Sequence, residues 1–305
     1  MFKYILKRIL VGLFTLFVLA TITFFLMKII PGSPFAGGNI NAEVKAQLMA
    51  KYNLDKPVLD QYMIYIRNAF VGDFGISTFS KGVKVTDVIA KGFPTTMRLG
   101  FVAFAISMTV GIGLGILSAF SKKKWVSNLV IFLSTIGVST PSFLMAILLM
   151  MILGAQLNWF PIIGLSTARH YFLPALSLSF YPISMISRLT RSSLQEVMKQ
   201  DYMVLAKSKG TSQLKVILKH GLRNAMIPVI TYAGPLIAIL LTGSFVIETL
   251  FSIPGIGAEY VMSITNRDYT MIMGMTILFG AFVILGNILS DIINALVDPR
   301  IKLSK

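Results

Sequence analysis

Long apolar stretches dominate this chain and alternate with shorter polar segments. An α-helix rises about 1.5 Å per residue, so roughly 20 apolar residues cross the hydrocarbon core of a membrane. Six stretches reach or approach that length: residues 9–30, 97–120, 126–153, 172–190, 226–249 and 271–296. The pattern therefore predicts an all-α integral membrane protein with six transmembrane helices.

The third and fourth stretches differ in how clearly they indicate a span. No charged residue lies between Val126 and Leu153. The fourth stretch is short, contains Pro174 and Pro182, and has Arg188 near its end. Membrane helices tolerate proline where neighbouring helices satisfy the freed carbonyl groups, so we expect the fourth helix to pack inside a bundle.

The first stretch is similar to a secretory signal, because Lys3, Lys7 and Arg8 precede an apolar run. The run from Ile9 to Ile30 is too long for a signal, and no small-residue cleavage site follows it. We therefore predict a retained first transmembrane helix within residues 1–30.

The composition agrees with a chain that is solvated by lipid. Hydrophobic residues make up 55% of the 305 and charged residues only 13%, which is too few for a water-soluble protein of this length. The net charge of +16 does not indicate a nucleic-acid partner, because the basic residues fall between apolar runs. There is no cysteine, and the two isolated histidines lack metal-binding spacing, so no metal site is expected.

The basic residues predict the orientation, because lysine and arginine in short loops stay on the cytoplasmic side. They gather at the N-terminus, in residues 122–124, throughout residues 188–223 and at the C-terminus. The short loops of the opposite side hold only Arg169 and Arg267, and the loop 31–96 is too long for the rule. Both termini are therefore predicted to be cytoplasmic.

The predicted extracellular region, residues 31–96, is long enough to fold at the membrane surface. Pro57 is well placed for the first turn of a short helix that runs through Phe70, and residues 72–77 indicate a turn. Two interpretations stay open: a small cap over the bundle, or a docking surface for an extracellular partner.

Residues 191–225 form a large loop on the predicted cytoplasmic side. An amphipathic run ends at Lys209, Gly210 follows, and a second run has apolar residues at helical spacing. Gly210 is therefore predicted to separate two short helices. The loop would present Leu205 and Ala206 to a cleft of a soluble partner, or else lie on anionic lipid.

The same loop carries an ordered set of residues: Tyr202, Ala206, Gly210, His220, Leu222, Arg223, Asn224, Ala225 and Pro228. By this set the chain resembles the permease subunits of binding-protein-dependent ABC importers, in the dipeptide, oligopeptide and nickel branch. Where the wider family has Glu-Ala-Ala, this chain has Val204, Leu205 and Ala206, so the role of the missing carboxylate is not transferred.

The resemblance extends along nearly the whole chain. It is carried by Pro31 to Pro34, Gly72 to Gly75, Ser77, Pro94 to Thr96, Gly243 to Glu248, Phe251, Pro254, Gly255, Gly257, Arg267 to Tyr269 and Asp298 to Arg300. The chain looks most like the oligopeptide permease subunit with the long first outer loop. Its Pro-Gly-Ser-Pro turn resembles the turn in oligopeptide permeases of Gram-positive bacteria. This resemblance implies that the chain lies in the plasma membrane of such a bacterium.

The resemblance implies that residues 97–305 form a permease core that pairs with a second, homologous permease. It also implies two cytoplasmic ATPase subunits and an extracellular substrate-binding lipoprotein that delivers oligopeptides, with dipeptides or nickel as the alternative cargo. ATP and Mg²⁺ would bind to the ATPases. No cofactor and no enzymatic activity are expected of this chain, in which no Gly-Lys pair of a P-loop occurs.

Two groups of residues take their roles from the resemblance. The cytoplasmic coupling helix, which would transmit movement of the ATPases, is represented by Tyr202, Leu205, Ala206, Lys207, Lys209, Gly210, His220 and Arg223. An apolar outer gate is represented by Ile253, Pro254, Gly255 and Ile256, although these residues would also fit a simple turn.

Polar groups inside spans avoid lipid, so polar and small residues of the spans are candidates for the lining of a translocation path. They are Ser139, Thr140, Pro141, Tyr181, Thr231, Tyr232, Thr242 and Ser244, for each of which helix packing is an equal alternative. The series Gly111, Gly113 and Gly115 is similar to a dinucleotide fingerprint, but no strand precedes it. Close helix packing is the expected role of these glycines.

An ion-coupled carrier is the main rival function. It would need a charged residue near the middle of a span, beside a broken helix. None of the six predicted spans has a central charge. A structural membrane-assembly protein would also explain six spans, but it would not explain the ordered residues of the loop 191–225.

Overall fold

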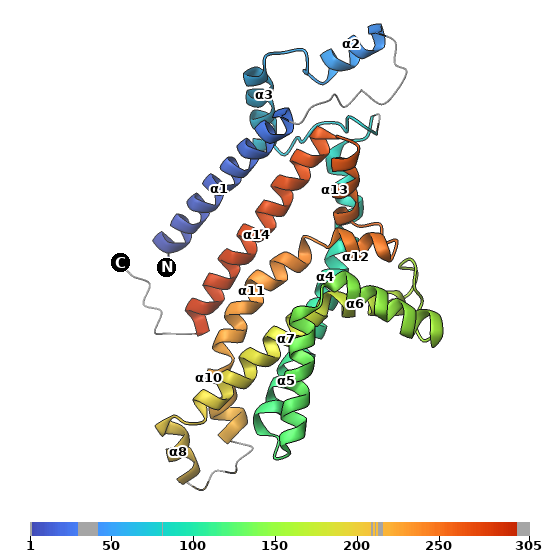
Figure 1. Cartoon of the computed structure of the whole chain (residues 1–305). Coiled ribbons are helices and arrows are strands. Elements are labelled where there is room, and N and C mark those ends of the chain that lie inside the picture. The colour runs from blue at the N-terminus through green and yellow to red at the C-terminus, as the bar shows by residue number, and fades with distance from the viewer. Residues whose placement is uncertain are drawn as a thin grey trace. The chain divides into compact units, whose positions relative to one another are not determined.

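The computed structural model describes residues 2–29, 42–80, 82–208, 210, 212 and 216–297 (Figure 1). Within these ranges the chain is helical, apart from turns and one isolated β-bridge between Ile76 and Lys84. The chain divides into two compact units. Unit 1 is Met1–Thr96 with Pro254–Ile284, and unit 2 is Met97–Ile253 with Leu285–Lys305.

Apolar helices long enough to cross a membrane occur in the described part of the chain. Three single helices qualify: α1 (Phe2–Ile29), α4 (Val85–Phe120) and α14 (Tyr269–Val297). A bent pair qualifies as well, formed by α5 (Lys124–Ser139) and by α6 (Ser142–Leu149) continued by η1 (Met150–Gln156). The shorter α11 (Ile227–Leu241) is also apolar. The all-α membrane fold is confirmed, while the count of six spans and the side of the termini stay predictions.

The third apolar stretch is not one continuous helix. Its two halves, α5 and α6, meet at an angle of 111°. Thr140 between them is extended, with φ −98° and ψ 123°, and Pro141 follows. Proline has no N–H to donate and disfavours the helical conformation of the residue before it, so the helix stops at Ser139. The absence of charge predicted a segment that is apolar enough to lie in a membrane, but it carries no information on whether the segment is one helix.

Unit 1 folds around two apolar clusters. One joins the end of α1 to α3 (Val58–Phe70) and to α14, with Phe24, Tyr62 and Met273 buried in it. The other joins the start of α4 to α13 (Ile256–Thr265) and α14 through Val85 and Met275. The helix predicted up to Phe70 is present, and α2 (Ala42–Lys51) precedes it. The described residues after the first span therefore form short helices and a turn that pack on α1 and α14, while the choice between a cap and a docking surface stays open.

Asp268 holds the loop around Ser77 and Thr78 to the start of α14. One carboxylate oxygen accepts from the backbone N–H and the hydroxyl of Thr78, both at 3.0 Å, and from the Thr270 hydroxyl at 3.0 Å. The other oxygen accepts from the Ser77 hydroxyl. Because Asp268 is buried, no water molecule can take its place as the acceptor for these donors.

We expect Asp268→Ala to destabilise unit 1 by about 3 kcal/mol, because several buried donors lose their acceptor. Thermal unfolding and limited proteolysis within residues 77–80 measure the effect. Asp73→Ala is the matched control, since Asp73 is exposed and accepts from Gly75 N–H in a local turn. Equal stability of the two variants would contradict the anchoring role of Asp268.

Unit 2 is built around α7 (Phe172–Val197), which packs against α5, α6, α11 and α12 (Phe245–Leu250). The glycines of α4 and α5 allow close approach. A Cβ at Gly115 would lie 2.4 Å from Thr190 Cβ, and one at Gly137 would lie 2.1 Å from Ser184 Oγ. The predicted packing role is thereby confirmed for Gly115 and for Gly111, which lies against Ile186. Gly113 makes no such close approach within this chain, because no heavy atom lies within 4 Å of a Cβ placed there.

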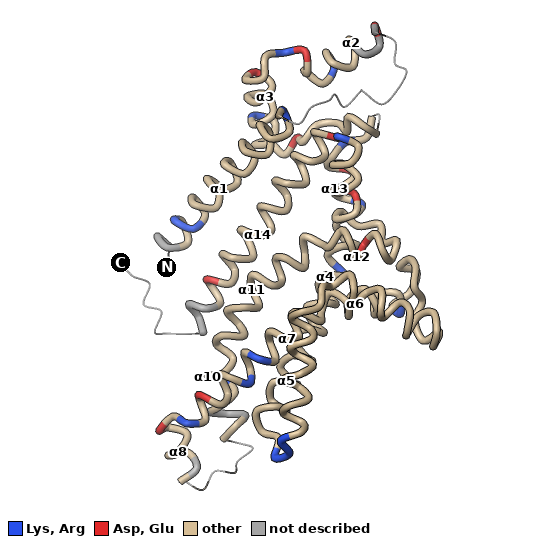
Figure 2. Tube along the Cα trace, viewed as in Figure 1, with Lys and Arg blue, Asp and Glu red and all other residues tan. Residues whose placement is uncertain are grey.

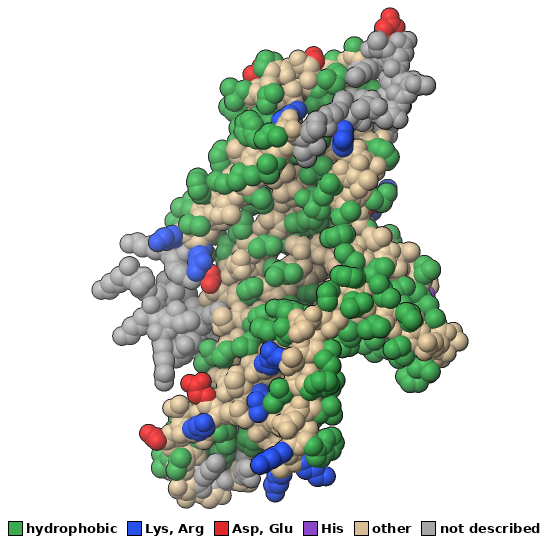
Figure 3. Space-filling model, in the orientation of Figure 1, with side chains coloured by type: hydrophobic (Ala, Val, Ile, Leu, Met, Phe, Trp, Pro, Cys, Tyr) green, Lys and Arg blue, Asp and Glu red, His purple; other side chains and the backbone are tan. Residues whose placement is uncertain are grey.

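The loop that was predicted to be cytoplasmic corresponds to short helices that follow α7. They are α8 (Asp201–Ser208), η3 (Val216–Gly221) and α10 (Leu222–Ala225), after which α11 begins. The 3₁₀ turn η2 (Ala168–Tyr171) leads into α7 at its other end. Apolar side chains cover α1 and the arm formed by α6 and η1 (Figure 3), as expected for surfaces in contact with lipid.

Candidate functional site

A polar stripe runs along the exposed face of α7. Tyr181, Arg188, Ser192 and Gln195 are separated by seven, four and three residues, which places them on one side of a helix, and all four are exposed. Figure 2 shows basic residues part-way along α7, between its ends. A lipid-facing helix surface would be apolar, so this face of α7 is fitted to water or to another protein.

The neighbouring helix α5 adds polar groups on its exposed surface. Asn128, Thr135 and Ser139 are exposed and lie at helical spacing. The Arg188 side chain donates to the Thr135 hydroxyl at 2.8 Å. Arg191 donates to the Ser127 hydroxyl at 3.4 Å. Two arginines of α7 are therefore held by hydroxyl groups of α5.

A hollow of about 400 Å³ opens beside these arginines, between α4, α5 and α7. Serine hydroxyls and apolar side chains line it together with the arginines: Ser118, Val130, Ile131, Ser134, Met185, Ser187, Arg188, Leu189, Arg191 and Ser192. No aspartate or glutamate is among the lining residues. The hollow is therefore positively charged and rich in hydrogen-bond donors, which suits an anionic group.

The other predicted path residues differ in their exposure. Ser139, Pro141 and Thr231 are exposed, and Thr140 forms the break between α5 and α6. Tyr232 packs against the core of unit 2. Thr242 and Ser244 are half-buried at the link between α11 and α12. That these residues line a path stays a prediction. The exposed residues agree with it better than Tyr232, which packs in the core.

The prediction from sequence did not include Arg188 or Thr135 among the path residues. The fourth span was predicted to end at residue 190, so Arg188 counted as a terminal residue, but α7 continues to Val197. The seven-residue interval from Tyr181 to Arg188, continued to Ser192 and Gln195, is the signal that would have placed all of them on one face.

The predicted outer-gate residues lie at the point in the sequence where unit 2 ends, at Ile253, and unit 1 resumes, at Pro254. Ile253 is buried in the core of unit 2. In unit 1, Ile256 is buried, and its backbone N–H donates to the Thr96 hydroxyl at 3.0 Å. Gly255 is buried and Pro254 is exposed. Each isoleucine thus has a packing role in its own unit, and closure of an outer mouth stays a prediction.

The predicted coupling segment is anchored by one face of α8 and exposed on the other. Met203 is fully buried against η3, where the missing side chain of Gly221 leaves room for it. The Asn224 amide donates to the Tyr202 hydroxyl at 3.0 Å, which ties α8 to α10. Leu205 and Val204, by contrast, are 57% and 56% exposed. The segment presents two apolar side chains on a fixed support.

The remaining coupling residues are placed as follows. Gly210 has φ +74°, a left-handed conformation that favours glycine, and Ala206 is half-buried. Arg223 is exposed on α10. Lys209 and the side chains of Lys207 and His220 lie outside the described residues, as do Pro31 to Pro34 and Asp298 to Arg300.

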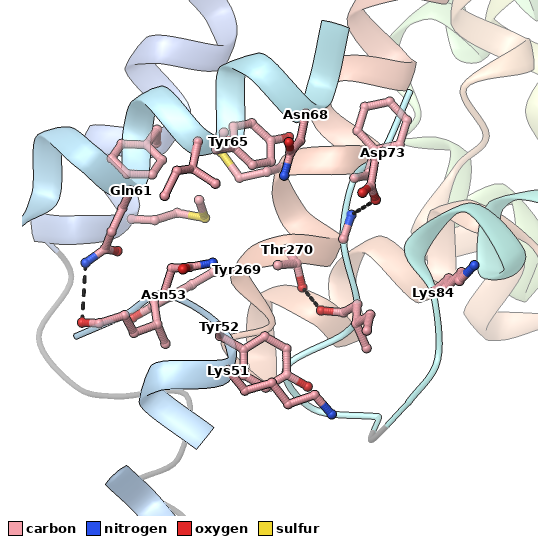
Figure 4. A pocket seen from close by; sticks show the side chains of 18 of the residues that line it. Lys51, Tyr52, Asn53, Gln61, Tyr65, Asn68, Asp73, Lys84, Tyr269 and Thr270 are labelled. Carbon is pink, nitrogen blue, oxygen red and sulfur yellow. Dashed lines mark hydrogen bonds between the residues drawn. The ribbon is translucent and has the colours of Figure 1, made fainter. Parts of the chain in front are cut away.

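Unit 1 holds a second hollow, of about 550 Å³, in the extracellular region predicted from sequence (Figure 4). Tyr52, Tyr65 and Tyr269 line it together with amide side chains and lysines. Burial and the negative charge of Asp268 raise the pKa of Tyr52, whose hydroxyl donates to the Ser77 carbonyl at 2.9 Å. Burial also raises the pKa of Tyr65. Both tyrosines therefore stay neutral over the physiological pH range, and Tyr52 acts as a hydrogen-bond donor.

Curated relatives match this chain from end to end. The dipeptide transport system permease protein DppB of Bacillus subtilis is 42% identical and covers 100% of this chain and 99% of the relative. The oligopeptide transport system permease protein OppB of Haemophilus influenzae is also 42% identical, over 99% of this chain and 100% of the relative. OppB of Escherichia coli is 39% identical, over 99% and 100%. The predicted Gram-positive origin is not supported specifically, because relatives from Gram-negative bacteria are equally similar.

Solved structures share the fold at low sequence identity. The MetNI methionine ABC transporter, in inward-facing conformations, matches with a TM-score of 0.55 and 16% identity, over 70% of this chain and 97% of the other. An amino acid ABC transporter with histidines matches with a TM-score of 0.53 and 14% identity, over 71% and 95%. These similarities support the permease fold alone.

Two family profiles cover almost the whole sequence. Residues 1–100 match the N-terminal membrane component of binding-protein-dependent transport systems. Residues 111–303 match the inner membrane component of the same systems. Together with the full-length relatives, they show that this chain belongs to the family of binding-protein-dependent transport system inner membrane components.

Proposed function

We propose that this chain is a permease subunit of an ATP-driven peptide importer. With a second, homologous permease it forms the path for oligopeptides that an extracellular binding protein delivers, and two cytoplasmic ATPases drive the cycle. The observation that carries the proposal is the full-length similarity, at 39–42% identity, to dipeptide and oligopeptide permeases. Both cargo classes occur among these relatives, so dipeptides are the alternative cargo.

The proposal includes six spans with both termini in the cytoplasm. Under this topology α7 and α11 cross the membrane, although neither is a long apolar helix. For α7 this is possible because α4, α5 and α11 cover most of its surface. A helix that is surrounded by protein needs no apolar surface towards lipid. Basic residues surround α8 in the sequence, with Lys199 before it, Lys207 within it and Lys209 after it, which agrees with a cytoplasmic position for it.

The geometry of α8 supports docking to an ATPase. Exposed Leu205 and Val204 provide an apolar contact, while buried Met203 and the Tyr202–Asn224 hydrogen bond hold the helix on α10 and η3. A movement of α8 is therefore transmitted to α11, which follows α10 directly. A coupling element needs both properties, a surface for the partner and a firm connection to the spans.

Replacing Gly210 with valine tests the proposed function. Valine strongly disfavours a φ of +74°, at a cost of about 1–2 kcal/mol, so we expect peptide-stimulated ATP hydrolysis to fall by about tenfold. The measurement uses the chain reconstituted with the partner permease, the ATPases and the binding protein. Gly164→Val is the control, because Gly164 has φ +88° in another loop of unit 2 with open space around it.

Three outcomes are informative. Loss of stimulation in Gly210→Val, but not in Gly164→Val, supports the coupling role. Equal activity of both variants and the unchanged protein would contradict it. If the unchanged chain binds no ATPase at all, the importer proposal itself fails.

A further inference from the structure

Arg188 lies deep along the membrane helices. Its hydrogen-bond acceptor, Thr135, is eleven residues beyond Lys124, where α5 starts. At about 1.5 Å per residue, Thr135 is roughly 16 Å from that end, which is near the middle of a hydrocarbon core about 30 Å thick. The chain therefore has a charged group at a depth where no central charge was predicted.

A cation at this depth needs compensation. An arginine at the centre of a bilayer is unfavourable by several kcal/mol, and such residues face water-filled cavities or a partner group. Arg188 is exposed, and the hollow beside it is lined by hydroxyl groups without a carboxylate. Within this chain Arg188 thus donates one hydrogen bond, to the Thr135 hydroxyl, and the residues that line the hollow supply no counter-charge.

The guanidinium group is suited to one class of ligand. It presents five N–H donors in a plane, and two of them match the two oxygens of a carboxylate. The hydrogen bond to Thr135 uses the Nη2 nitrogen of Arg188 and fixes the direction of the side chain. A free peptide carries a carboxylate at its C-terminus. We propose that Arg188 binds this C-terminal carboxylate during translocation and that Thr135 positions Arg188 for it.

The depth of Arg188 favours a peptide over a lipid headgroup as the ligand. Phosphate groups of lipids lie outside the hydrocarbon core, far from Thr135. Arg191 is the shallower cation, since its partner Ser127 lies only three residues beyond Lys124. A peptide moving along α7 would meet the two arginines in succession. This inference rests on the proposed function, because it requires that peptides pass along this face.

The test compares one peptide in two forms, with a free C-terminal carboxylate and with a C-terminal amide. Uptake into proteoliposomes is measured with the complete importer, and each rate is normalised to the measured occupancy of the binding protein. We expect Arg188→Gln to lower uptake of the free acid by about tenfold, as for the loss of a hydrogen bond to a charged group. Uptake of the amide should stay unchanged, and Arg188→Lys should restore part of the difference.

Two further variants separate recognition from folding. Thr135→Val preserves the shape of an exposed side chain and removes only the positioning hydroxyl, so it should reduce uptake of the free acid selectively. This variant decides the question if Arg188→Gln fails to assemble. Lys199→Gln removes an exposed cation beyond the end of α7 and should change neither rate.

The outcomes distinguish this inference from the proposed function. Equal loss of both peptide forms in the variants would mean that Arg188 serves folding or a contact with the second permease, and it would overturn the inference. Unchanged uptake, or no preference for the free acid in the unchanged importer, would overturn it as well. If the assembled importer with bound ATPases takes up neither form, the proposed function fails instead.

Discussion

Gly115→Val is expected to prevent unit 2 from folding stably, whereas Gly113→Val, two residues away on α4, is expected to leave it intact. A Cβ at Gly115 would lie 2.4 Å from Thr190 Cβ and 2.8 Å from the Ser187 carbonyl oxygen. Backbone and a β-branched side chain cannot yield locally, so α4 and α7 must separate. Overpacking of this kind destabilises a protein by about 3 kcal/mol.

The glycine at 113 provides a strict control for this experiment. It is on the same helix, in the same apolar run, and a Cβ there would have no heavy atom within 4 Å. Both variants lose the same glycine flexibility and add the same side chain. The yield of monodisperse protein in detergent and its thermal unfolding are the measurements. Equal losses in the two variants would show that the helix itself, and not its contact with α7, is sensitive.

The apolar pattern predicted the class of the fold because lipid imposes a simple rule on sequence. A long apolar run must be a helix when no water can satisfy its backbone. This rule says nothing about whether the run is one helix. The break at Thr140 follows from Pro141, a local signal that was present in the sequence, whereas Pro182 and Pro235 lie within continuous helices. Packing decides between these outcomes, and packing is not visible in a single sequence.

The candidate site was only partly predictable for a related reason. An apolar stretch marks where lipid touches a helix, so the predicted fourth span ended where polar residues became frequent. The helix α7 is enclosed on most sides, and it continues with a polar face through Ser192 and Gln195. The coupling segment was predicted through family resemblance, and its coupling role stays a prediction. The structure adds that Met203 is its anchor and Leu205 its exposed side chain.

Leu205→Asp is expected to abolish coupling to the ATPases under the proposed function. Leu205 is 57% exposed, so the substitution leaves the interior of unit 2 unchanged. In an apolar contact with a partner, however, a central side chain contributes about 2–4 kcal/mol, and a buried carboxylate adds a desolvation penalty. Peptide-stimulated ATP hydrolysis should therefore fall by about a hundredfold. Thermal unfolding of the isolated chain should not change.

Gln200→Asp is the control, because it adds the same charge in the exposed turn before α8. It separates the effect of losing the Leu205 side chain from the effect of adding a negative charge. If both variants lose stimulation, negative charge near the ATPases is the cause, and Leu205 is not a specific contact. If neither loses it, α8 rests on lipid and couples nothing. Selective loss in Leu205→Asp has one physical explanation: an apolar side chain, held outward by the buried Met203 of the same helix, enters a dry pocket of a partner. The alternation of buried and exposed apolar residues along α8 is then the means by which a short helix is fixed to the spans on one face and to an ATPase on the other.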